Sequence, residues 1–345
     1  MRRVAVVMAG GSGERFWPVS TKGRPKQFLN LASPDKTLLE EAVDRAIAVA
    51  GANASYIATG RHLAEASSTA CPALPPGNVW AEPTKRNTLG CLVWVAANLL
   101  AQEDDATVAV LTADQRIAPM EGFASTVDKA LCAAESEGGI VVIGVKPTRP
   151  ETGFGYIEVG GPAGNVHRVQ RFREKPDLAT AQEFLSSGRF LWNSGMFFYT
   201  LSTFMRELDR QAPEVAETTR KLSQLLRLGD TAQADELFAT LPNLSIDYAM
   251  MEHAEPVFVA PAEFEWDDLG AWDALARSYA PDAAGNVVQG EADLIEANGN
   301  TVYVDGTGVR VAMLGVDDLV VVVTADRVLV LPKHRAQEVK KFLNP

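Results

Sequence analysis

The chain has 345 residues, of which 47% are hydrophobic, and its formal net charge at pH 7 is -12. A chain of this length and composition can bury a sizeable core, and the length suggests one large domain plus a smaller one, or two domains. The acidic charge argues against a general nucleic-acid binder, which normally carries a basic patch or stripe. Any anionic ligand must therefore meet a local cluster of cations.

The cysteines and the N-terminal residues indicate the compartment. Cys71, Cys91 and Cys132 are widely spaced and lack a C-x-x-C pattern, so the sequence predicts neither a disulfide framework nor a zinc site. The first apolar run is too short for a secretory signal peptide, and no segment is long and apolar enough for a membrane span. We therefore expect a cytoplasmic protein with no membrane partner.

In the first half of the chain, short runs rich in Val and Ile alternate with helical patterns. At residues 37–50 apolar side chains recur at helical spacing, Thr37 and Glu40 form a capping box, and Gly51 ends the pattern. Strands alternating with helices predict a Rossmann-like, mixed but mostly parallel sheet flanked by helices, which binds ligands beyond the carboxyl ends of its strands. Buried strands are predicted at residues 4–9, 56–59, 107–111 and 140–145.

The rest of the chain mixes strands and helices and ends in a β-rich region. Turn formers gather at residues 278–286, and short strands punctuated by glycine turns follow, with a helical tail from His334. We expect a large domain over residues 1–277 and a small all-β domain over residues 286–345. Between residues 155 and 241 the patterns predict a strand pair at 155–160 and 166–172, a capped helix at 177–188, a strand at 190–200 and mostly helix at 201–241.

The glycine-rich stretch AGGSGER, residues 9–15, directly follows the first predicted strand. Glycines let the chain turn sharply and bring N–H groups within reach of an anion, and nearby cations can neutralise it. Arg15, Lys22, Arg24 and Lys26 supply such cations. The stretch is neither a P-loop nor a dinucleotide fingerprint, because both patterns fail at Phe16. It predicts an anion-binding loop of another kind, and a tight turn with solvated charges is the alternative.

Eight blocks in the chain resemble those of the sugar-1-phosphate nucleotidyltransferases, and in particular their mannose-1-phosphate guanylyltransferase branch. The order of the blocks is also that of the family. They are AGGSGERFWPVS with RPKQFL near the N-terminus, EPTKRNT at 82–88, TADQRI at 112–117, RPETGFGYIE at 149–158, FREKPD at 172–177, FLWNSGMFFY at 190–199, SIDYAMME at 245–252 and FEWDDLGAWDAL at 264–275.

The resemblance implies a fold, a reaction and partners. The fold is the nucleotidyltransferase α/β fold over residues 1–277, followed by a short left-handed β-helix-like domain that often supports dimerisation, so we expect a homodimer. The reaction is transfer of GMP from GTP to mannose 1-phosphate, which gives GDP-mannose and pyrophosphate. The alternatives are the same reaction with another sugar 1-phosphate or nucleoside triphosphate, or a non-catalytic regulatory relative that binds nucleotide sugars.

The resemblance also assigns residues to the nucleotide. The glycine loop wraps the nucleotide, and Arg15 and Lys26 serve the triphosphate. A guanine site needs acceptors for the N1–H and amino groups and donors for O6, and the EPTKRNT block offers both. The predicted nucleotide-binding residues are Ala9, Gly10, Gly11, Gly13, Glu82, Asn87 and Thr88.

Sugar and metal residues follow from the remaining blocks. Mg²⁺ is assigned to Asp114 and Asp268, since the family keeps an acid directly before Leu-Gly, which selects Asp268 over its neighbour Asp267. The family commonly has histidine where this chain has Gln115. In SIDYAMME, Ser245 or Asp247 either caps a helix or serves the site. The sugar is assigned to Gly155, Glu174, Lys175 and Asn193, and Lys175 binds the sugar phosphate.

Overall fold

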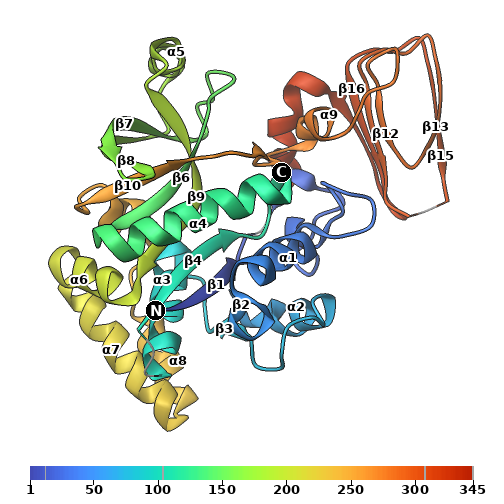
Figure 1. Ribbon diagram of the computed structural model, residues 1–345. Helices are drawn as coiled ribbons and strands as arrows, with labels where there is room; N and C mark the ends of the chain where they lie inside the picture. The colour runs from blue at the N-terminus through green and yellow to red at the C-terminus, as the bar shows by residue number, and fades with distance from the viewer. Residues whose placement is uncertain (12, 103–104, 307, 344–345) are drawn as a thin grey trace. The chain divides into compact units, whose positions relative to one another are not determined.

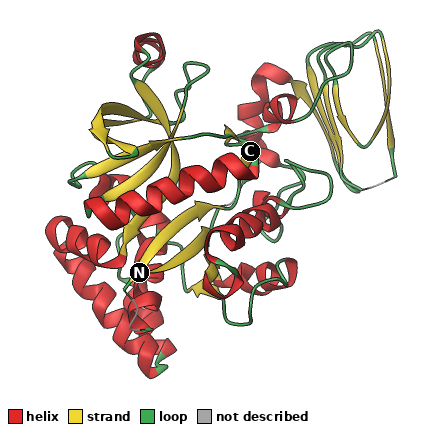
Figure 2. Cartoon of the chain, viewed as in Figure 1, coloured by secondary structure: helices red, strands yellow, loops and turns green. Residues whose placement is uncertain are grey.

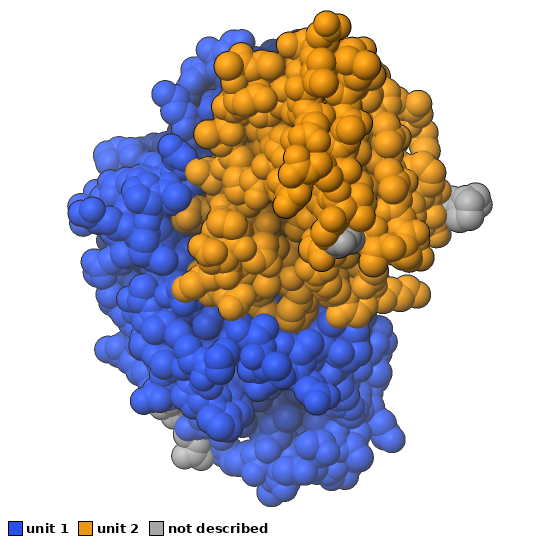
Figure 3. All heavy atoms as spheres, turned by 90° about the vertical axis from the view of Figure 1, so that its right-hand side faces the viewer, with its two compact units in different colours: residues 1–10, 42–112, 118–265 blue, residues 11–41, 113–117, 266–345 orange. Residues whose placement is uncertain are grey.

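The computed structural model describes residues 1–11, 13–102, 105–306 and 308–343, so Ser12 of the glycine loop and residues 307, 344 and 345 of the predicted C-terminal domain lie outside the described residues. The chain forms two compact units (Figure 3). Unit 1 comprises residues 1–10, 42–112 and 118–265, and unit 2 comprises residues 11–41, 113–117 and 266–345. Each unit has its own cluster of buried hydrophobic side chains.

Unit 1 is built around one mixed sheet with strand order β3-β2-β1-β4-β9-β6-β10-β8-β7 (Figures 1 and 2). The pairings make seven of these described strands run in one direction, while β8 and β9 run in the other, so the predicted mixed, mostly parallel sheet is confirmed. The strands are β1 (Arg2–Met8), β2 (Ser55–Gly60), β3 (Val79–Glu82), β4 (Ala106–Thr112), β6 (Ile140–Val145), β7 (Gly155–Ala163), β8 (Val166–Glu174), β9 (Phe190–Thr200) and β10 (Val257–Pro261).

Helices cover both faces of this sheet. Val4 of β1 lies in the buried cluster to which α3 (Asn87–Ala101) contributes most of its apolar side chains. The preceding residue, Arg3, donates a hydrogen bond to Glu135 of α4 (Met120–Glu137), with Nε 3.0 Å from Oε1. Because successive side chains of a strand point to opposite faces, α3 and α4 lie on opposite sides of the sheet.

The predicted capping box opens α1 (Leu38–Ala50). The Thr37 amide donates to Glu40 Oε2 at 2.8 Å, and the Glu40 amide donates to Thr37 Oγ1 at 3.2 Å. Gly51 follows the helix with a φ of 76°, as expected of a residue that ends a helix. The residues of α1 from Ala42 onward belong to unit 1, and Leu38–Glu41 belong to unit 2. Unit 1 also contains α2 (Ala64–Ala70), α5 (Leu178–Ser187), α6 (Leu201–Gln211), α7 (Pro213–Leu228) and α8 (Thr231–Ala239).

Unit 2 contains the β-rich C-terminal region. Its strands stack in parallel coils: β12 pairs with β14 and β14 with β16, while β13 pairs with β15 in a second sheet. The predicted helical tail is a 3₁₀-helix, Lys333–Phe342, which packs on the same core as Phe16 and Trp272. Its elements are β12 (Val287–Gln289), β13 (Glu291–Ile295), β14 (Thr301–Val304), β15 (Arg310–Leu314), β16 (Leu319–Val323), β17 (Val328–Pro332) and α9 (Leu275–Ser278). Most residues of the short pair β5 (Arg116–Ala118) and β11 (Glu265–Asp267) also belong to unit 2.

Two buried asparagines hold the coils together at one corner. Asn300 Nδ2 donates to Asn286 Oδ1 at 3.1 Å and to the Val316 carbonyl at 2.9 Å. Asn300 Oδ1 accepts from the Leu319 amide at 2.9 Å, so one side chain joins three successive turns. The ladder satisfies backbone groups that the corner of a coil would otherwise bury without partners.

Candidate active site

The glycine loop comes close to Lys26, and Gly13 makes this approach possible. Gly13 has a φ of 58°, in the left-handed region that favours glycine. A Cβ added to it would lie 2.2 Å from Lys26 Cβ and 2.7 Å from the Lys26 amide nitrogen. The Gly13 carbonyl accepts hydrogen bonds from Ser20 Oγ at 2.7 Å and from the Phe16 amide at 3.0 Å. Only glycine fits this position without moving the backbone of Lys26.

Lys26 is buried between the two predicted metal ligands. Its side chain is 7% exposed, and Nζ lies 3.1 Å from Asp114 Oδ2 and 2.6 Å from the carbonyl oxygen of Asp268. Nζ also lies 5.8 Å from the centre of the Phe16 ring. A buried ammonium needs both hydrogen-bond acceptors and a counter-charge, and Asp114 and Asp268 supply them. Three segments that are far apart in the sequence thus meet at this amine.

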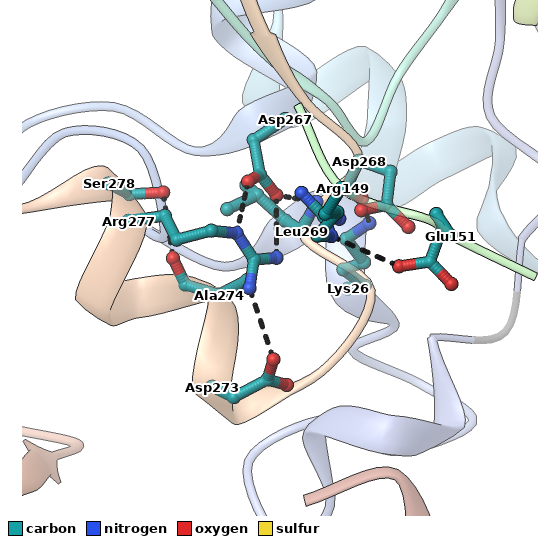
Figure 4. A network of polar contacts seen from close by, with 10 residues as sticks. All are labelled: Lys26, Arg149, Glu151, Asp267, Asp268, Leu269, Asp273, Ala274, Arg277 and Ser278. Carbon is teal, nitrogen blue, oxygen red and sulfur yellow. Dashed lines mark hydrogen bonds and ion pairs between the residues drawn. The ribbon is translucent and has the colours of Figure 1, made fainter. Parts of the chain in front are cut away.

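Asp267 and Asp268 have different roles in unit 2 (Figure 4). The buried Asp267 carboxylate accepts from Arg277 Nε at 2.6 Å and from the Leu269 amide at 2.8 Å, so it fixes the turn that follows β11. The Asp268 carboxylate lies over Gly270, where an added Cβ would be 2.7 Å from Oδ2. Asp268 lines the cavity described next, which supports the choice of Asp268 over Asp267 as the metal residue.

One cavity of about 430 Å³ collects the predicted phosphate and metal residues of unit 2. Arg15 is exposed at this cavity, while Lys26 forms part of its buried wall. Of the other predicted loop residues, Gly11 belongs to unit 2, and Ala9 and Gly10 belong to unit 1. The lining residues are Gly13, Glu14, Arg15, Phe16, Lys26, Asp114, Gln115, Asp268, Gly270 and Lys340.

The chemistry of this cavity suits a divalent metal ion that takes some of its ligands from a substrate. Asp114 and Asp268 offer carboxylate oxygens, and the Asp114 side chain is 43% exposed. The described residues contain no group of three or more His, Cys, Asp or Glu side chains placed to hold a metal alone. Mg²⁺ commonly binds through one or two carboxylates, with phosphates and water completing its shell. The residues therefore fit such an ion.

Unit 1 brings the predicted sugar residues together. Gly155 begins β7 opposite Glu174, the last residue of β8. A Cβ on Gly155 would lie 2.6 Å from Glu174 Oε2 and 3.4 Å from Asn193 Cβ, so glycine leaves room for both side chains. Lys175 Nζ lies 2.9 Å from Glu174 Oε1, and this hydrogen bond raises the pKa of Lys175. A carboxylate, an amide and an ammonium therefore converge at one end of the β7–β8 pair.

Asp247 joins this group, although the sequence left its role open. It begins a turn of π-helix, Asp247–Met251. Burial raises the pKa of Asp247 to about 6, with a further contribution from the charge of Glu174, while the charge of Lys175 lowers it. A half-buried carboxyl near a second carboxylate favours a site role over a simple helix cap. The sequence signal for this role was the SIDYAMME block.

The predicted guanine residues lie around the start of α3. Glu82, the last residue of β3, is buried, and burial raises its pKa to about 7 while a hydrogen bond with Cys91 lowers it. Asn87 is exposed with a φ of 57°, and its Oδ1 accepts from the Thr88 amide at 2.9 Å. Thr88 Oγ1 accepts from the Ile246 amide at 2.9 Å. Thr88 therefore also ties this loop to the segment that carries Asp247.

Gln115 and Lys340 are among the cavity-lining residues to which the sequence analysis assigned no role. Gln115 Oε1 accepts from Trp266 Nε1 at 2.8 Å, so the residue that replaces the family's usual histidine is held beside Asp114. Lys340 reaches the cavity from the C-terminal 3₁₀-helix. The helical tail was predicted, but no local pattern could indicate which part of the chain it would contact.

The fold and the residue groups above are those expected of a transferase that acts on phosphorylated substrates, and comparison with known families agrees. Residues 4–284 match the family model described as Nucleotidyl transferase, so the chain belongs to the nucleotidyl transferase family. Residues 282–344 match a second model, described as the MannoseP isomerase/GMP-like beta-helix domain. Members of the family generally use a divalent metal ion and act on nucleotides and sugar phosphates.

Individual relatives agree with this membership. The chain is 36% identical to the mannose-1-phosphate guanylyltransferase of Escherichia coli K12 over 348 residues, which are 98% of this chain and 72% of the relative. It is also 36% identical to the xanthan biosynthesis protein XanB of Xanthomonas campestris, over 98% of this chain and 72% of that protein. A solved structure named mannose-1-phosphate geranyltransferase, from Thermus thermophilus, is 37% identical and superposes with a TM-score of 0.89, covering 100% of this chain and 99% of that one.

No helix among the described residues has both the length and the apolar character needed to cross a membrane. Cys71, Cys91 and Cys132 all lie among the described residues, and none of them forms a disulfide there.

Proposed function

We propose that the protein transfers GMP from GTP to α-D-mannose 1-phosphate and releases GDP-mannose and pyrophosphate. The observation that carries the proposal is the unit 2 cavity, where buried Lys26 contacts Asp114 and Asp268 and exposed Arg15 lies on the wall. The choice of substrates follows the names of the relatives. The Escherichia coli relative, which is similar to this chain over nearly its whole length, is named mannose-1-phosphate guanylyltransferase.

The reaction needs charge neutralisation more than proton transfer. The second pKa of a phosphate monoester is near 6, so at neutral pH the sugar phosphate is already an anionic nucleophile. Its oxygen forms a bond to the α-phosphorus of GTP while the bond from that phosphorus to the bridging oxygen breaks, and the electron pair leaves with pyrophosphate. The protein must hold two polyanions in line and offset their repulsion.

The unit 2 residues supply cations and a metal site for the triphosphate. Arg15 and Lys26 bind phosphate oxygens, and the amides of the glycine loop add donors without adding charge. Asp114 and Asp268 would hold Mg²⁺, which supplies positive charge to the phosphates when bound. Lys26 is already oriented by its two acceptors, so ordering it on substrate binding costs little conformational entropy.

The unit 1 residues supply recognition. Glu174 accepts hydrogen bonds from sugar hydroxyls, and the Asn193 amide donates to and accepts from them. The amide of Gly155 approaches the sugar closely, and Lys175 binds the sugar phosphate. Glu82, Asn87 and Thr88 are proposed to read guanine. Asn87 is the exposed member of that set, so we expect it to contact the base directly.

We further propose that residues 1–277 form the catalytic domain and residues 286–345 the β-helix-like domain, a division supported by the two family models, which meet at residues 282–284. The homodimer and the cytoplasmic location stay predictions from the sequence.

The experiment that tests the proposal measures pyrophosphate release with four nucleoside triphosphates against mannose 1-phosphate, glucose 1-phosphate and galactose 1-phosphate, each with Mg²⁺. We expect the highest kcat/KM for GTP with mannose 1-phosphate. A higher kcat/KM for another pair would replace the proposed substrates but keep the reaction. No release with any pair, together with tight binding of GDP-mannose, would establish a non-catalytic binding protein.

A further inference from the structure

The C-terminal 3₁₀-helix, Lys333–Phe342, is anchored beside the glycine loop within unit 2. Ala336 and Val339 are each 1% exposed and lie in the buried cluster that contains Phe16. Residues three apart lie on one face of a 3₁₀-helix, so these two side chains define its buried side. Past them, the ring of Phe342 stacks on Trp17, with centroids 5.1 Å apart and an interplanar angle of 13°.

This anchoring brings Lys340 to the cavity that holds Arg15, Lys26, Asp114 and Asp268. Lys340 directly follows the buried Val339, and its side chain is exposed at the cavity. Among the last ten described residues, Lys340 is the one that lines this cavity. It lies more than three hundred residues along the chain from the glycine loop.

Lys340 differs from the other cations of the same helix in its partners. Arg335 and Lys341 both form ion pairs with Glu338, at 2.8 Å and 2.5 Å. Among the described residues, no side-chain hydrogen bond or ion pair engages the Lys340 amine. The helix therefore pairs two of its cations with Glu338 and presents Lys340 to the cavity without an ion-pair partner among the described residues.

The charges around the cavity indicate what Lys340 does there. The positive charge of Lys26 is largely offset by Asp114 at 3.1 Å. Glu14 and Asp268 add two further negative charges to the wall, and Arg15 and Lys340 are the exposed positive ones. A metal ion and Arg15 together do not offset all the negative charge of a nucleoside triphosphate. An additional cation at the wall therefore strengthens binding.

We propose that Lys340 is a phosphate-binding residue of the active site, which binds the terminal phosphates of the nucleotide and the pyrophosphate that leaves. The C-terminal segment thereby completes the nucleotide site, and the β-helix-like region has a direct part in substrate binding. This inference rests on the proposed function, because the glycine-loop side of the cavity is assigned to the triphosphate.

The test uses the intact protein and inorganic pyrophosphate with Mg²⁺ as the probe, measured by calorimetric titration. We expect Lys340→Ala to raise the Kd for pyrophosphate about tenfold, the range of one hydrogen bond to a charged group, and Lys340→Arg to stay near wild type. Lys341→Ala is the matched control, since it removes the neighbouring charge that Glu338 already pairs. Equal affinity of wild type and Lys340→Ala would overturn the proposal, as would an equal loss in Lys341→Ala.

Steady-state kinetics add a second readout. Lys340→Ala should raise the KM for GTP and leave the KM for mannose 1-phosphate within about twofold, whereas a merely structural role would change both. The binding titration contains neither guanine nor sugar. A wild type that binds pyrophosphate through Lys340 but does not turn over GTP with mannose 1-phosphate would refute the proposed function and keep the phosphate site.

Discussion

Replacing Gly13 by alanine tests how the glycine loop positions Lys26. A residue with a side chain at a φ of 58° costs about 1–2 kcal/mol relative to glycine. The new Cβ would also lie 2.2 Å from Lys26 Cβ, so the two segments must separate by about 1 Å, and overpacking of this kind costs about 1–3 kcal/mol. We therefore expect Gly13→Ala to lower the free energy of unfolding by about 2–5 kcal/mol.

The same displacement should reduce catalysis. Lys26 Nζ is 2.6 Å from the Asp268 carbonyl, and a shift of about 1 Å breaks that hydrogen bond. Misplacement of a catalytic group by about 1 Å can cost about 100-fold in rate, so kcat/KM for pyrophosphate release should fall by about that factor.

The assay combines urea unfolding, followed by tryptophan fluorescence, with steady-state kinetics. Gly23→Ala is the matched control, because Gly23 lies in the same unit, its φ is not positive, and an added Cβ would meet nothing within 4 Å. If Gly13→Ala unfolds at the same urea concentration as Gly23→Ala and keeps wild-type kcat/KM, the close approach of Gly13 to Lys26 does not organise the site.

Three further predictions concern pH and buried polar contacts. Burial raises the pKa of Glu82 to about 7, so the folded state favours its protonated form, and this stability is lost as pH rises from about 4.5 through 7. Between pH 5 and pH 8, the free energy of unfolding of Glu82→Gln, measured in urea, should thus rise by up to about 3 kcal/mol relative to that of wild type. A difference in unfolding free energy that does not change with pH would count against a raised pKa of Glu82. Arg277→Met should destabilise unit 2 by about 2–4 kcal/mol, because it leaves the buried Asp267 carboxylate without its arginine partner. The double variant with Asp267→Asn should recover part of this loss in the same assay. Additive losses in the two single variants would show that the pair does not interact. Asn300→Ala should cost about 2–4 kcal/mol, since it leaves the Leu319 amide without its acceptor, and unchanged thermal unfolding of this variant would show that the asparagine ladder is dispensable.

Local patterns were sufficient to predict many elements of the fold, but not β3 or β10 of the main sheet. The strand at residues 140–145 coincides with β6, and the capping box of Thr37 and Glu40 forms the predicted hydrogen bonds, because apolar periodicity and helix caps depend on neighbouring residues. The resemblance of ordered blocks supplied the residue types of the site. It named Lys26, Asp114 and Asp268, which the structure brings to one cavity.

Long-range contacts could not be predicted in this way. Lys340 has no motif of its own, and its position depends on the burial of Ala336 and Val339 in a core built from distant segments. The bond from the Ile246 amide to Thr88 Oγ1 likewise joins two blocks that the sequence treats separately. Spacing within a motif carries no information about which other motif lies beside it.

The central claim is that Asp114 and Asp268 serve the chemistry of one metal-dependent transfer site. Its most direct test is single-turnover pyrophosphate release from GTP and mannose 1-phosphate by Asp268→Asn, with GTP binding measured in parallel and Asp293→Asn, an exposed aspartate of β13, as control. We predict a rate at least about 100-fold below wild type, with GTP binding retained and the control unchanged. A wild-type rate in Asp268→Asn would contradict the assignment of this cavity as the active site.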